Sequence, residues 1–148
     1  MCLIVDMNVA HKILLAESDA DFKDVHASLF GNKGTISKLV YGGELLREYN
    51  KNNAVRRQIA LLDTAGRARK ISDEQVDEES GNVSRSGLCV SDDPHIIALA
   101  RVRSVRLLCS HDQNLHQDFT NKTLLDHPRG KVYQNSTHKD LLRQFCKT

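Results

Sequence analysis

The feature that most constrains the fold of this chain is an alternation of short strand-like runs with helical patterns. The strand-like runs have the length typical of buried strands, and they occupy residues 2–5, 36–41, 68–72, 105–109 and 130–134. Strands that alternate with helices form βαβ units, whose sheet is mainly parallel and is covered by helices on both faces. The sequence therefore predicts a three-layer α/β/α fold with a mainly parallel central sheet.

Helical patterns fill most of the segments between these runs. One follows Val9, Ile13 and Leu14, and the others cover residues 44–49, 52–66, 73–80, 94–103, 110–119 and 137–145. Gly66 predicts a helix end, because glycine adopts left-handed backbone angles at little cost. Glycine and serine in residues 81–87 predict a flexible loop. The length of 148 residues fits one domain over residues 1–148.

Composition and charge narrow the classes of protein. Apolar residues make up 40% of the chain and charged residues 27%, an ordinary globular balance. The net charge of +2 is too small to indicate a nucleic-acid partner by itself. We expect neither a membrane partner nor a signal peptide, because no apolar run is long enough and the N-terminus lacks a basic segment. The cysteines form no CxxC pair, which predicts reduced thiols in a cytoplasmic protein; they are Cys2, Cys89, Cys109 and Cys146.

Acidic residues follow several of the predicted strands or begin the neighbouring helices. They are Asp6, the pair Glu44 and Glu48 one helical turn apart, the pair Asp92 and Asp93, and Asp112. In a parallel sheet these positions lie at the carboxyl ends of the strands, where ligands usually bind. Neighbouring carboxylates repel each other unless a cation lies between them, and oxygen ligands suit Mg²⁺ or Mn²⁺. Such ions can activate water and neutralise the charge of a phosphodiester under attack.

Each acid also has a purely structural explanation. Asp93 precedes Pro94, which is a favoured sequence at the start of a helix. Asp6 and Asp112 are equally suited to capping the helices that follow them, and Glu48 to an exposed helix face. Capping readily explains any one of these acids alone. It is a weaker explanation for four acids that all lie at equivalent strand ends.

Four motifs, in chain order, resemble those of the PIN-domain nucleases. They are VDMN with Asp6 and Asn8, GGELLREY with Glu48, SDDPHIIALA with Asp93, and LLCSHDQNL with Ser110 and Asp112. The order and spacing fit over roughly residues 2–135. The resemblance implies a metal site formed by Asp6, Glu48, Asp93 and Asp112. It implies supporting roles for Asn8, Glu44, Asp92, Ser110 and Asp118.

Two choices among these acids stay open in the sequence. Glu48 is preferred to Glu44 because it lies a full turn into its helix and Tyr49 follows it, as an apolar or aromatic residue does in the family. Asp93 is preferred to Asp92 because it keeps the family's distance to the apolar positions of the next helix.

The resemblance implies metal-dependent cleavage of RNA by a toxin-like stand-alone member, with Mg²⁺ or Mn²⁺ as cofactor. It also implies an antitoxin protein and a homodimer as candidate partners. Basic residues could supply phosphate contacts, and the chosen ones are Arg47, Lys51, Arg56 and Arg57. Two other functions use the same acids: a catalytically inactive PIN-like binding module, and a metal-dependent phosphoesterase acting on another substrate.

Overall fold

The computed structural model describes residues 2–15 and 19–146. Its strands are β1 (Ile4–Val5), β2 (Leu39–Tyr41), β3 (Ala68–Lys70), β4 (Leu107–Cys109) and β5 (Lys131–Tyr133). Its α-helices are α1 (Met7–Leu14), α2 (Lys23–Phe30), α3 (Gly43–Asn50), α4 (Asn53–Thr64), α5 (Asp73–Ser86), α6 (Pro94–Arg103), α7 (Gln113–Phe119) and α8 (Asp140–Phe145). A short 3₁₀ turn, η1 (Ser136–His138), precedes α8.

All strand pairs are parallel, and together they give the order β3-β2-β1-β4-β5. The two pieces of the sheet meet at a parallel bridge between Leu3 and Leu39, where Val40 N donates to Leu3 O at 3.0 Å. Ile4 pairs with Leu108, and Leu108 pairs with Val132. β1 is the central strand: β2 and β3 follow on one side of it, and β4 and β5 then follow on the other. The direction in which strands are added therefore reverses at β1. This confirms the predicted parallel α/β fold.

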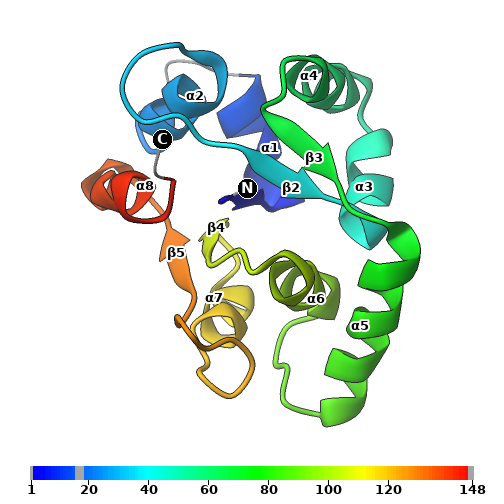
Figure 1. The fold of residues 1–148 in the computed structure, drawn as a ribbon. Helices are drawn as coiled ribbons and strands as arrows, with labels where there is room; N and C mark the ends of the chain where they lie inside the picture. The colour runs from blue at the N-terminus through cyan, green and yellow to red at the C-terminus, as the bar shows by residue number, and fades with distance from the viewer. Residues whose placement is uncertain (1, 16–18, 147–148) are drawn as a thin grey trace.

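Helices cover both faces of the sheet (Figure 1). α1, α2 and α4 lie together on one side, and α6 and α7 lie on the other. α3 contacts α1 and α4 as well as α5 and α6, so it joins the two layers at one edge. The residues of β1, β2 and β4 are buried on both faces, as their short apolar runs predicted. The edge strands β3 and β5 expose Arg69, Lys70 and Lys131. No helix among the described residues has the length and apolarity that crossing a membrane requires.

Helix α2 lies in a segment to which the sequence assigned no element. Its buried face consists of Val25, Ser28 and Leu29, and the serine interrupts the apolar period that would have revealed it. Ser28 is satisfied there by hydrogen bonds to Val25 O at 2.7 Å and Ser37 Oγ at 2.6 Å. The Arg67 guanidinium then donates to carbonyls at the end of α2, among them Leu29 O at 2.9 Å.

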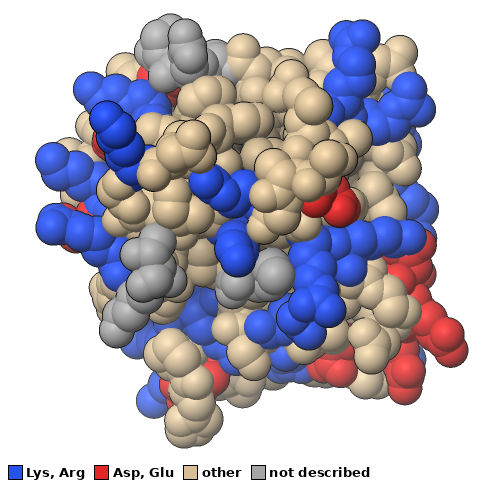
Figure 2. Space-filling view, turned by 45° about the horizontal axis from the view of Figure 1, so that its top comes forward, with Lys and Arg blue, Asp and Glu red and all other residues tan. Residues whose placement is uncertain are grey.

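The flexible loop predicted at 81–87 is wrong, because α5 continues through residue 86. Val76 and Val83 are both fully buried and lie two turns apart, so one face of α5 packs along α6. This packing overrides the low helix propensity of Gly81. The helix ends at Gly87, whose φ of +71° is left-handed. Its first turn carries Asp73 and Glu74, and acidic side chains gather at the lower right edge of the face in Figure 2.

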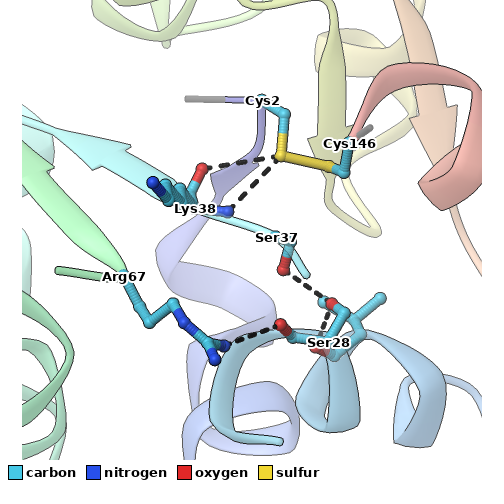
Figure 3. Close-up of a disulfide and its surroundings, with 7 residues drawn as sticks. Cys2, Ser28, Ser37, Lys38, Arg67 and Cys146 are labelled. Carbon is cyan, nitrogen blue, oxygen red and sulfur yellow. Dashed lines mark hydrogen bonds between the residues drawn. A yellow bond between two sulfur atoms is a disulfide. The ribbon is translucent and has the colours of Figure 1, made fainter. Parts of the chain in front are cut away.

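The expectation of four reduced cysteines is also wrong, because Cys2 and Cys146 form a disulfide (Figure 3). The two cysteines are 144 residues apart. β5, η1 and α8 carry the chain back to the start of β1, and this return could not be read from cysteine spacing. Cys89 and Cys109 are free, the former partly buried and the latter buried. Because disulfides are rare in the reducing cytoplasm, the cysteines no longer support the predicted cytoplasmic location.

Candidate functional site

The site lies where the order of the sheet reverses, between the carboxyl ends of β1 and β4. Asp6 follows β1 and Ser110 follows β4, and Ser110 Oγ donates a hydrogen bond to Asp6 Oδ2 at 2.8 Å. Asp6 N also donates to Cys109 O at 3.0 Å, so the two strand ends are held together. The crevice at such a reversal is the usual ligand site of open parallel sheets.

Asp6 is almost fully buried, and its burial raises the pKa of its carboxyl to about 6. The hydrogen bond from Ser110 opposes this shift, while the nearby carboxylates of Asp93 and Glu48 add to it. Asp6 occupies the N-cap position of α1, yet its side chain makes no capping hydrogen bond. Capping therefore does not explain this carboxylate.

Asp93 shows the same combination at the start of α6. It occupies the N-cap position before Pro94, and its side chain makes no capping hydrogen bond. Partial burial raises the pKa of its carboxyl; His95 opposes the shift, and the carboxylates of Glu48, Asp112 and Asp92 add to it. The acids from four segments thus act on one another electrostatically. We call Asp6, Glu48, Asp93 and Asp112 the acid cluster.

Of the two candidate glutamates, Glu48 is the one that adds to the raised pKa of Asp6 and of Asp93. His95 Nε2, from the first turn of α6, lies 3.0 Å from Glu48 Oε1. Glu44 is about half exposed and pairs with Arg47, whose guanidinium also bonds Asp77 at 2.9 Å. The hydrogen bond from Arg47 lowers the pKa of Glu44. The structure therefore places Glu44 in a surface ion-pair network.

Asp112 combines a structural role with its place in the cluster. Its Oδ1 accepts hydrogen bonds from Asn114 N at 3.0 Å and Leu115 N at 3.2 Å, so it caps α7. Its own N–H donates to Ser110 Oγ at 3.0 Å. Asn8 accepts from His111 N at 3.4 Å. Asn8 and Ser110 thus connect the end of β1 to the turn that carries Asp112.

The remaining two supporting acids differ in position. Asp92 is exposed beside Asp93. Asp118 is 1% exposed, and its carboxylate faces the loop 87–93 that precedes α6. Ser91 in that loop is a residue that sequence reasoning missed, since a serine beside two aspartates has no distinctive signal. The sequence also does not predict the contact between His95 and Glu48.

The donor set of the acid cluster fits a hard divalent cation, because all of its ligand atoms would be carboxylate oxygens. As the side chains are oriented, no three His, Cys, Asp or Glu residues in the described part of the chain converge to hold a metal ion. Three of the four carboxylates point to other partners: Ser110, His95 and the amides of α7. Metal binding would therefore require side-chain rotation, most clearly of Glu48 away from His95.

The predicted RNA-binding residues differ in their contacts. Arg47 is held by Glu44 and Asp77, whereas Lys51, Arg56 and Arg57 are exposed and form no ion pair with any described residue. α3 lies between α4 and α6, so the arginines of α4 are separated from Asp93 by a helix. Figure 2 shows lysine and arginine dispersed over the visible face.

No family model matches the chain, and no curated protein matches it significantly.

Proposed function

We propose that this protein is a metal-dependent nuclease that hydrolyses RNA phosphodiester bonds. The observation that carries the proposal is the placement of Asp6 and Asp93. Both are at least partly buried, neither caps its helix, and each has its pKa raised by burial with a contribution from the other acids. Such an arrangement costs stability without a cation and is relieved by one. Asp6 accepts a hydrogen bond from Ser110, and burial still raises its pKa.

Each residue has a distinct part in this proposal. Asp6, Glu48, Asp93 and Asp112 would hold Mg²⁺ or Mn²⁺. Ser110 holds one oxygen of Asp6 by a hydrogen bond. His95 holds Glu48 in the metal-free protein. When bound, the metal supplies charge neutralisation and activation of water for attack on phosphorus.

The choice of RNA as substrate rests on the resemblance of the four motifs to those of PIN-domain nucleases. A toxin role, an antitoxin partner, a homodimer and a cytoplasmic location are parts of the same proposal and rest on that resemblance. The acid cluster would attract a basic side chain from such a partner. Suppression of toxicity by the product of a neighbouring gene would support this part.

Cleavage assays with three substrates test the proposal. The purified protein with Mn²⁺ is offered labelled RNA, a DNA strand of the same sequence, and a phosphomonoester. We expect RNA to be cut, and cutting to stop in excess EDTA. Hydrolysis of the phosphomonoester alone would identify a phosphoesterase. Binding of RNA without cleavage of any substrate would identify an inactive binding module.

Charge reversal of Arg56 together with Arg57 tests the basic helix. If α4 binds the backbone, the double variant should lose RNA affinity and show a shallower dependence of affinity on salt, with unchanged Mn²⁺ binding. Normal RNA binding by this variant would remove α4 from the substrate surface.

A further inference from the structure

We infer that Asp118 is a positioning residue, whose buried carboxylate fixes the loop 87–93 and thereby places Asp93 in the acid cluster. This inference rests on the proposed function for the role of Asp93. It gives a specific form to the supporting role that the resemblance implies for Asp118.

The contacts of Asp118 run to the loop. Its Oδ1 accepts a hydrogen bond from Val90 N at 2.9 Å. Its Oδ2 accepts from Ser91 N at 3.0 Å and from Ser91 Oγ at 2.6 Å. The carboxylate is therefore satisfied by three donors from two adjacent residues, which accounts for a charged group with 1% exposure. In contrast to Asp6 and Asp93, Asp118 has no need of a cation.

Ser91 passes the constraint on to Asp93. Its hydroxyl donates to Asp118 and also accepts from Asp93 N at 3.3 Å. A serine hydroxyl has one donor and two acceptor sites, so it can make both bonds together. A chain of hydrogen bonds thus runs from α7 through Ser91 to the backbone of Asp93. The start of α6 and the turn that carries Asp112 are held in register by the same helix.

The loop depends on these bonds because its side chains pack poorly. Leu88 is 42% exposed and Val90 is 51% exposed, so apolar burial contributes little at these positions. No regular element crosses residues 88–93. Segments with few buried contacts open more readily than packed helices. A ligand on such a loop needs support from outside the loop to keep its geometry.

Two variants and a control test the inference. Asp118→Asn keeps the shape of the side chain but turns one acceptor oxygen into an amide that faces backbone N–H groups. Ser91→Ala removes only the hydroxyl that joins Asp118 to Asp93. This smaller change keeps the inference testable if Asp118→Asn fails to fold. Asp140→Asn alters an aspartate that is exposed and pairs with Arg143, so it serves as the matched control.

Amide hydrogen exchange of the metal-free proteins is the first measurement. In Asp118→Asn, the amides of Val90 and Ser91 should exchange at least about tenfold faster, whereas amides in β4 should be unchanged. The second measurement is the Mn²⁺ affinity by calorimetry, which should fall about tenfold or more in Asp118→Asn and by less in Ser91→Ala. Asp140→Asn should match the wild type in both.

The outcomes separate the two proposals. Unchanged exchange at Val90 and Ser91 in Asp118→Asn would overturn the positioning role, even in an active nuclease. Faster exchange with unchanged Mn²⁺ affinity would also overturn it, because the loop would then not place a ligand. If the wild type neither binds Mn²⁺ nor cleaves RNA, the proposed function fails, and the exchange result alone decides whether Asp118 anchors the loop.

Discussion

At the scale of single residues, the acids divide by what their carboxylates touch. Asp112 caps a helix, Asp118 anchors a loop and Glu44 belongs to a surface ion pair. Asp6 and Asp93 stand at helix starts without capping them. An acid directly before a helix therefore has a different role in different places. Only the contacts of each side chain distinguish a structural acid from a candidate ligand.

The raised pKa of Asp6 predicts a pH-dependent penalty on the metal-free fold. Burial raises the pKa of its carboxyl from 3.8, the value for the unfolded chain, to about 6 in the folded protein. Between these values the unfolded chain releases its proton first, so stability falls as pH rises and stays reduced above about pH 6. Asp6→Asn removes this penalty and should stabilise the metal-free protein at neutral pH by about 2 kcal/mol, or roughly 4–8 °C in melting temperature.

Thermal denaturation at about pH 4 and about pH 7 checks this prediction. The advantage of Asp6→Asn should be small at the lower pH, where the wild-type carboxyl is protonated in the folded state. Added Mn²⁺ should stabilise the wild type and not the variant. An advantage of equal size at both pH values would show that ionisation of Asp6 is not its source.

The two glutamates of α3 form a natural pair for mutagenesis. Glu48→Gln should reduce Mn²⁺-dependent cleavage by about a hundredfold, because it removes a ligand charge. Glu44→Gln should have little effect, since it breaks only an exposed pair with Arg47. Initial rates of RNA cleavage at saturating Mn²⁺ measure both. A larger loss in Glu44→Gln would reverse the assignment of the ligand.

At the scale of elements, the sequence predicts what is local and misses what depends on distant packing. The runs around β2 and β4 were recognisable because their residues are apolar and bounded by helical patterns. α2 was not recognised because the polar residue Ser28 lies on its buried face, and the partner of Ser28, Ser37, lies outside the helix. α5 was cut short by Gly81, because burial of Val83 against α6 has no local signal. The preference for Asp93 over Asp92 stays a prediction; Asp93 is partly buried and Asp92 is exposed.

Glycines inside and at the end of α5 predict opposite effects of alanine. Gly81 has helical backbone angles, and a methyl group there would meet only the flexible guanidinium of Arg85, 3.2 Å away. Gly81→Ala should therefore stabilise the protein by about 0.5–1 kcal/mol. Gly87 has a φ of +71°, so Gly87→Ala should destabilise it by about 1 kcal/mol. Urea denaturation of both variants gives the two signs, and stabilisation by both would contradict the account of the helix end.

At the scale of the whole molecule, the sheet and the disulfide bring distant parts of the chain together. The reversal of strand order places β1 beside β4, so that residues more than 100 positions apart, Asp6 and Ser110, share a hydrogen bond. The Cys2–Cys146 disulfide closes nearly the whole chain into one loop (Figure 3). The order of motifs along the sequence predicted the first juxtaposition through the α/β pattern. The second depends on the path of α8 and could not be predicted.

Reduction of the disulfide should lower stability by up to about 5 kcal/mol, since the closed loop spans nearly all of the chain. The melting temperature of the wild type should fall in a phosphine reductant, and Cys2→Ser should melt at the reduced wild-type value in either condition. The strands and helices should persist in the circular dichroism spectrum at room temperature. If the reductant lowered the melting temperature of Cys2→Ser as much as that of the wild type, this disulfide would not be the cause of the change.

Titration of Mn²⁺ into the metal-free protein tests the central claim most directly, because it asks whether the acid cluster is a metal site independently of any substrate. Calorimetry at about pH 7.5, where Asp6 is ionised, should show binding in the micromolar to millimolar range. Asp93→Asn should weaken this binding about tenfold or more, whereas Asp92→Asn should bind nearly as the wild type does. Absence of Mn²⁺ and Mg²⁺ binding by the folded wild type, or equal binding by wild type and Asp93→Asn, would contradict the account.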